Sequence, residues 1–147
     1  MGFHLFAKNV YDEDLCFVRD LIEMGSAIAS VTSIPVMRQI INDIIEKYGL
    51  QSKLQEFSEN QHYIIKDAYP GNRSKRLSQA KELLNIAKRL RLNDTENATI
   101  VYAATQCIKR MGFSYEEKIQ LIKDCLITTT GNPDVDNMLI NSYIDLL

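Results

Sequence analysis

Helical periodicity is clearest in residues 74–90, which read SKRLSQAKELLNIAKRL. The apolar side chains of this stretch recur every three or four positions, a spacing that places them on one face of an α-helix. They are Leu77, Ala80, Leu83, Leu84, Ala87 and Leu90. The stretch therefore predicts an amphipathic helix whose apolar stripe packs against the rest of the protein.

The same spacing continues on both sides of this stretch and is interrupted at glycines and prolines. Predicted helices cover residues 12–24, 35–48, 52–68, 74–90, 94–111 and 134–147, and a further helix begins at Ser114. Ser33 is suited to cap the second helix, and Asn93 or Asp94 the fifth. Ser114 and Glu117 have the spacing of a capping box, which marks a helix start.

Two short segments allow alternatives. Residues 26–33 are small and β-branched, so they either form a connector after Gly25, the glycine expected to close the first helix, or extend that helix. Residues 1–10 form either a short strand or an apolar arm. Strand-type alternation does not persist elsewhere. The sequence therefore predicts an all-α fold, a single compact domain over residues 1–147 with six to seven helices packed as antiparallel neighbours.

Composition limits the class of protein. With 147 residues, of which 46% are hydrophobic, the chain can bury one full core. It lacks an apolar run of about 18 residues, the length of a membrane span, and its start lacks the features of a secretory signal. The three cysteines show no Cys-x-x-Cys spacing, so we expect buried, reduced thiols and a cytoplasmic location.

Charge is strongly segregated along the chain. Residues 61–91 carry eight basic and two acidic side chains, a net charge of +6, whereas the segments before and after them each carry −4. The basic residues of interest are Arg73, Lys75, Arg76, Lys81, Lys88, Arg89 and Arg91. On a helical wheel of residues 74–90, five of them flank or oppose the apolar stripe, which predicts a cationic outer surface. They are Lys75, Arg76, Lys81, Lys88 and Arg89. Such a surface has three interpretations. In the first it balances acidic neighbours within the fold, in the second it binds nucleic acid, and in the third it binds an acidic protein or another anionic surface.

Motifs for catalysis or metal binding are absent from the sequence. His4 and His62 belong to no metal-binding motif, and the acidic run 12–14 is typical of a helix start, where carboxylates complement the helix dipole. Residues 71–76, Gly-Asn-Arg-Ser-Lys-Arg, form either a basic turn or a weak phosphate-binding loop at a helix start. We therefore expect a protein without cofactor, metal or enzymatic activity.

One stretch resembles a known family. Residues 111–114, Met-Gly-Phe-Ser, are followed by a predicted helix, by Gly131-Asn132 and by a last helix that ends in two leucines. This arrangement is similar to the ubiquitin-associated domain, a three-helix module whose Met-Gly-Phe loop contacts ubiquitin. The resemblance implies a ubiquitin-binding module over residues 98–147. Lys118 departs from the family, which usually has a small residue there, and the segment after Gly131 is several residues too long.

Small size, an acidic pI of about 5.7 and the missing catalytic motifs favour a protein that works by binding another protein. An Ile-, Asn- and Lys-rich composition is typical of bacterial or phage genes. The most concrete expectation is an immunity protein that neutralises a cognate toxin, with nucleic-acid binding by helix 74–90 as the alternative. The immunity protein would use the acidic starts of its helices to cover a basic, nuclease-type cleft of the toxin. The expected contact residues are Asp12, Glu13, Asp14, Asp134 and Asp136.

Overall fold

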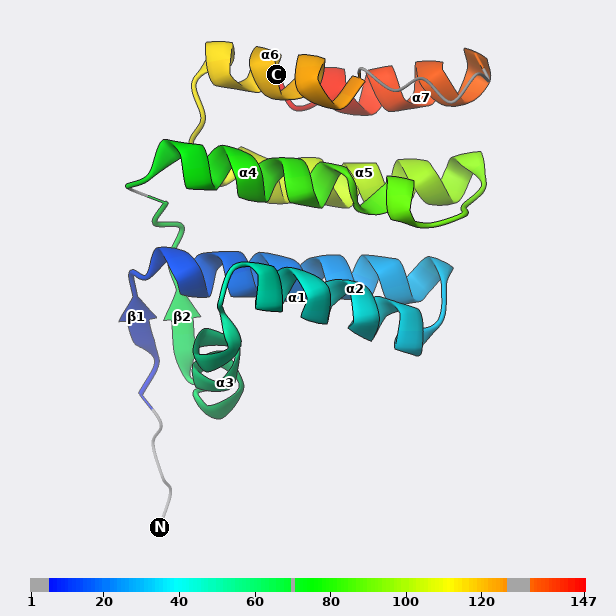
Figure 1. Cartoon of the computed structure of the whole chain (residues 1–147). Coiled ribbons are helices and arrows are strands. Elements are labelled where there is room, and N and C mark those ends of the chain that lie inside the picture. The colour runs from blue at the N-terminus through cyan, green and yellow to red at the C-terminus, as the bar shows by residue number, and fades with distance from the viewer. Residues whose placement is uncertain (1–5, 70, 127–132) are drawn as a thin grey trace.

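In the computed structural model, which describes residues 6–69, 71–126 and 133–147, helices pair into antiparallel hairpins that stack in three layers (Figure 1). The first layer contains α1 (Glu13–Val31) and α2 (Ile34–Lys47), and α3 (Gln51–Glu59) lies beneath them. Two short strands, β1 (Lys8–Val10) and β2 (Tyr63–Ile65), lie beside α3.

The second and third layers are hairpins of similar length. The second contains α4 (Arg73–Leu84), a 3-10 turn named η1 (Ile86–Arg89) and α5 (Asp94–Lys109), and the third contains α6 (Tyr115–Leu126) and α7 (Pro133–Ile144). The described residues thus form seven α-helices and two three-residue strands, which confirms the prediction of an all-α fold with six to seven helices.

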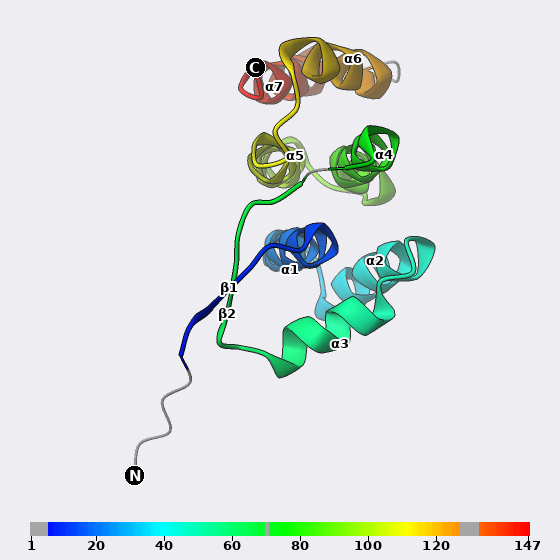
Figure 2. The ribbon, with the colours of Figure 1, turned by 90° about the vertical axis from the view of Figure 1, so that its left-hand side faces the viewer.

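Seen nearly along the helix axes, the layers form two columns (Figure 2). One column contains α1, α5 and α7, and the other contains α2, α4 and α6. The helices α1, α4 and α6 all begin at the same edge of the stack (Figure 1). One apolar core runs through all three layers, and its members include Phe17, Ile44, Leu83, Leu84, Ile108 and Leu121.

The first helix is longer than its expected end at Gly25, so residues 26–31 extend it rather than connect it. Gly25 is buried inside α1, where an added Cβ atom would lie 3.3 Å from the Met37 sulfur of α2. The glycine therefore allows a close approach of two helices instead of closing one. Ser33 caps α2 as predicted, because its hydroxyl accepts a hydrogen bond from the Val36 N–H.

The predicted helix over residues 52–68 is wrong beyond Glu59. Asn60 follows the end of α3, and its side chain donates to the Glu56 carbonyl. The chain then turns into β2, which pairs in parallel with β1 and places Val10 opposite Ile65. β-branched Ile64 and Ile65 favour an extended backbone once a partner strand exists. The short-strand alternative for the N-terminal segment is therefore the correct one.

The predicted helix over residues 74–90 also ends early. Its α-helical part stops at Leu84, and Asn85 starts the tighter turn η1 because asparagine stabilises a helix interior poorly. The predicted capping box of Ser114 and Glu117 opens α6. Asn93, one of the two residues predicted to cap α5, is its N-cap and forms a second capping box with Glu96.

Candidate functional site

The basic segment 73–91 lies between acidic residues of the first and third layers. Five of its seven cations of interest form ion pairs with carboxylates outside the segment, at nitrogen–oxygen distances of 2.7–3.3 Å. The pairs are Arg73–Glu117, Lys75–Asp14, Arg76–Glu13, Lys81–Asp124 and Arg89–Asp43. The charge segregation of the sequence is therefore largely neutralised within the fold, as the first of the three interpretations expects.

Arg76 does not belong to a cationic outer surface, so the helical-wheel prediction is wrong for this residue. Its side chain is fully buried and donates to the side-chain amide oxygen of Gln79. The guanidinium lies 3.0 Å from a Glu13 carboxylate oxygen and 5.4 Å from the centre of the Tyr69 ring. A buried charge requires such partners. Arg76 therefore holds α4 against the start of α1.

Residues 71–76, for which a basic turn and a phosphate-binding loop were the two alternatives, make similar contacts within the fold. Asn72 caps α4 by accepting a hydrogen bond from the Lys75 N–H, and Gly71 adopts a positive φ of 107°. Arg73 donates to the Gly112 carbonyl at 3.0 Å and also pairs with Glu117 of α6. These contacts favour the alternative of a basic turn between layers.

Three cations at the other end of the segment are exposed: Lys88, Arg89 and Arg91. Lys88 donates to the Cys125 carbonyl at 2.8 Å, and Arg89 pairs with Asp43 at 3.3 Å. These three residues are the exposed part of the predicted nucleic-acid-binding surface.

The acidic run Asp12–Asp14 is engaged by basic side chains of the same chain. Asp12 caps α1 by accepting from the backbone N–H groups of Asp14 and Leu15, and its other carboxylate oxygen lies 2.7 Å from the Lys53 ammonium. Burial raises the pKa of Asp12, but these hydrogen bonds outweigh burial and leave the pKa below its usual value. Since Glu13 and Asp14 pair with Arg76 and Lys75, the whole run helps to join the layers.

The second predicted acidic site lies in the first turn of α7, where Asp134 is exposed and Asp136 is half-buried. It is far along the chain from the first acidic site, and it lies in the last layer of the stack (Figure 1). The structure therefore does not bring the two predicted acidic sites together on one surface.

Helix α7 and the turn that follows it carry both buried and exposed apolar side chains. Tyr143 and Leu146 are buried in the core, whereas Ile140, Ile144 and Leu147 are 39%, 58% and 47% exposed. The exposed three are spaced i, i+4 and i+7, which places them in one row, and the Leu147 N–H continues the turn by donating to the Ile144 carbonyl. We call these three residues the α7 stripe. A second apolar row on a surface helix is typical of a covered interface.

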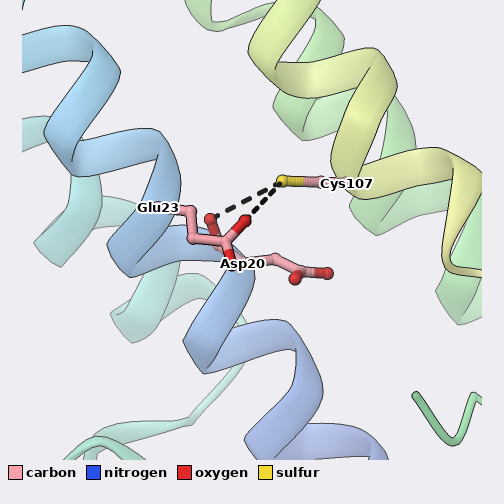
Figure 3. A group of neighbouring side chains, drawn as sticks. All are labelled: Asp20, Glu23 and Cys107. Carbon is pink, nitrogen blue, oxygen red and sulfur yellow. Dashed lines mark hydrogen bonds between the residues drawn. The ribbon is translucent and has the colours of Figure 1, made fainter. Parts of the chain in front are cut away.

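A polar cluster that the sequence did not predict joins α1 to α5 (Figure 3). Asp20 is fully buried, and the Tyr69 hydroxyl donates to its carboxylate. The Arg110 guanidinium lies 2.8 Å from Asp20 and 2.5 Å from Glu23. The sequence contains one signal that Asp20 is buried. Asp20 is four residues from Cys16 and from Met24 and so falls on the apolar face of α1. Nothing local links it to Arg110.

Within this cluster, Asp20, Glu23 and Cys107 place their oxygen and sulfur atoms within 4.8 Å of one another, as metal ligands do. The Arg110 guanidinium contacts all three side chains, and the Arg19 guanidinium lies 3.2 Å from Asp20, so two cations face the two carboxylates. Burial and the nearby Asp20 carboxylate raise the pKa of Cys107 to about 12, so the thiol stays protonated. The arrangement is that of a buried ion-pair network rather than a metal site.

The loop that resembles a ubiquitin-associated domain faces inward. Met111 and Phe113 are buried in the core, and Gly112 ends the turn after α5 with a positive φ of 69°. The Arg73 guanidinium covers the Phe113 ring at 5.1 Å. The apolar side chains that the resemblance would present to ubiquitin are therefore used inside this protein. Residues 131 and 132 lie outside the described residues.

A surface cavity of about 480 Å³ lies between α2 and α4. Its charged groups are paired, Lys47 with Glu82 at 2.8 Å and Lys81 with Asp124 at 2.7 Å. Tyr48 and Ser78 share a hydrogen bond at its edge. The cavity is thus a groove between α2 and α4 that the Lys47–Glu82 ion pair and the Tyr48–Ser78 hydrogen bond already bridge.

Within the described ranges, no helix combines the length and apolarity needed to cross a bilayer. Comparisons with protein-family models, with curated proteins and with solved structures found no match to this chain. A functional proposal therefore depends on the geometry of the chain's own residues.

Proposed function

We propose that this protein is a non-enzymatic interaction protein that binds a protein partner through the α7 stripe. The observation that carries the proposal is that Ile140, Ile144 and Leu147 are exposed although Tyr143 and Leu146 of the same segment already pack in the core. Covering such a row with a partner releases water from apolar surface, which favours association. An i, i+4, i+7 row is also the pattern by which helices dock into grooves.

The charge next to the stripe suggests the kind of partner. Asp134 and Asp136 lie in the first turn of the same helix, where their charge also complements the helix dipole. A surface with an apolar row and acidic residues at one end suits a partner with basic residues around an apolar centre. An inhibitor or immunity-type protein that covers the basic cleft of a toxin is the concrete form of this proposal.

The alternative of nucleic-acid binding has less support. Five of the seven cations in the basic segment already pair with carboxylates, and binding to phosphates would require those pairs to separate. Among the seven cations of the basic segment, Lys88, Arg89 and Arg91 are exposed in the structure. A test by charge reversal should therefore use Lys88→Glu with Arg91→Glu, since reversal of buried Arg76 would disrupt the fold.

The proposal is tested by matched substitutions of two exposed isoleucines. Ile144 is 58% exposed on the α7 stripe, and Ile34 is 53% exposed at the start of α2. Affinity purification from the native host should recover one partner with the wild-type protein and with Ile34→Ser. With the purified partner, Ile144→Ser should weaken binding at least about tenfold, because burying one large aliphatic side chain contributes about 1.5–3 kcal/mol.

Equal binding by both variants would contradict the proposal for the α7 stripe. For the toxin-inhibitor form, the recovered partner should lose its toxic activity when the wild-type protein is added at equal concentration. A partner that stays fully active in that mixture would rule out inhibition while leaving the contact surface in place.

A further inference from the structure

The outer edge of β1 has backbone groups that do not face β2. The Lys8 N–H donates to the His62 carbonyl at 3.1 Å, and the Lys66 N–H donates to the Val10 carbonyl at 2.9 Å. Residues 8 and 10 therefore face β2. Because successive residues of a strand direct their N–H and C=O groups to alternate sides, those of Asn9 point away from β2.

The surroundings of this edge are open in the described part of the chain. In Figure 1, β1 is the outermost element on its side of the molecule, and β2 lies between it and α3. Figure 2, which looks onto that side, shows no other described element in front of the strands. An open strand edge is a template for pairing with another strand.

Two aromatic side chains flank the edge. Phe6 is 82% exposed and Tyr11 is 72% exposed, the two highest values among the large apolar side chains that the structure describes. Both are within three residues of Asn9. An edge with free backbone groups and exposed aromatic rings at its ends has the two components of a strand-addition site, which are main-chain hydrogen bonds and side-chain contacts.

We infer that β1 pairs with β1 of a second copy of this chain, in antiparallel orientation, to give a four-stranded sheet in the order β2-β1-β1-β2. The outer edges of β1 in two copies are complementary to each other in this orientation. With Asn9 opposite Asn9 of the other copy, each N–H donates to the other carbonyl, as in a hydrogen-bonded antiparallel pair. The contact is then symmetric about a two-fold axis, as most homodimer interfaces are.

This register also places side chains of suitable size together. Ala7 of each copy lies opposite Tyr11 of the other, so a small residue faces a large ring on the same side of the sheet. Lys8 lies opposite Val10, so like charges do not meet. The contact is nevertheless short, and interfaces below about 1,200 Å² are typical of weak complexes. We therefore expect dimers at concentrations of about 100 µM and above.

Sedimentation velocity of the purified chain between about 10 µM and about 1 mM, with two variants of one residue, tests this inference. Asn9→Pro removes only an N–H that faces outward, a position where edge strands tolerate proline. Asn9→Ala is the matched control, since it removes the side chain and keeps the N–H. Wild-type protein and Asn9→Ala should dimerise with rising concentration, whereas Asn9→Pro should remain a monomer with an unchanged circular dichroism spectrum.

Wild-type protein that stays monomeric at about 1 mM, or Asn9→Pro that dimerises like wild type, would overturn the inference. If Asn9→Pro unfolds, hydrogen exchange of the backbone amides in the wild-type protein tests the inference instead. Protection of the Asn9 amide should rise with concentration while that of Val10 stays constant, and a constant Asn9 amide contradicts the dimer. Ile144→Ser should dimerise like wild type; loss of dimers in that variant would assign the contact to the α7 stripe instead.

Discussion

Helices α1 and α7 both begin with acidic residues, and the two starts have different surroundings. At the start of α1, Asp12, Glu13 and Asp14 each lie within 3.1 Å of a basic nitrogen of α3 or α4. At the start of α7, Asp134 is exposed in the last layer of the stack. Both complement a helix dipole, and the carboxylates of the first also join α1 to α3 and α4. The local sequence therefore predicts the helix start and not the role of the carboxylates.

The largest expected difference between the two starts concerns Glu13. Glu13→Ala leaves the fully buried Arg76 without its carboxylate, so we expect a loss of about 3–5 kcal/mol in the free energy of unfolding. Asp134→Ala should change it by less than about 0.5 kcal/mol. Urea unfolding of both variants measures the contrast. Equal losses would mean that the Glu13–Arg76 pair does not join the layers.

Substitutions in the core and on the α7 stripe should differ in how much they lower the free energy of unfolding. Leu84→Ala and Ile108→Ala remove fully buried side chains, and each should cost about 2–5 kcal/mol through lost burial and a cavity. Ile144→Ala, on the stripe, should cost less than about 1 kcal/mol. A loss of about 3 kcal/mol for Ile144→Ala would show that this side chain belongs to the core, and the proposed contact surface would be lost with it.

The N-cap of α1 gives a smaller effect. Asp12→Ala removes both the cap and the Lys53 contact and should cost about 1–2 kcal/mol. Asp12→Asn keeps a capping side chain and should cost less than half as much. Chemical denaturation of the two variants compares them. Identical losses would assign the whole effect to the charge of Asp12 rather than to the cap.

The smallest effect is a pH dependence of the same carboxylate. The pKa of Asp12 is lower in the folded protein than its unfolded value of about 3.9, so its contribution is present above that pH and is lost as the pH falls through the folded pKa. The advantage of wild type over Asp12→Asn should therefore be about 1 kcal/mol or less at pH 6 and should vanish at about pH 2. An advantage that grows on acidification would contradict this sign.

Periodicity and capping residues predict most helices of this chain because those signals are local. They fail at residues 60–68, where the extended backbone of Ile64 depends on a partner strand more than fifty residues away in the sequence. They fail again for Arg76, since a helical wheel cannot show that Glu13 and Tyr69 lie opposite it. Asp20 could have been found from its spacing, but its partner Arg110 is ninety residues away.

Photo-crosslinking from two positions tests most directly whether α7, and not the basic segment, is the contact surface for a partner. A photoreactive phenylalanine analogue is placed at Ile144 or at Lys88, both exposed, and the native host is irradiated. We expect a covalent product with one protein from position 144 and no nucleic-acid product from position 88. A nucleic-acid product from position 88, with no protein product from position 144, would contradict it.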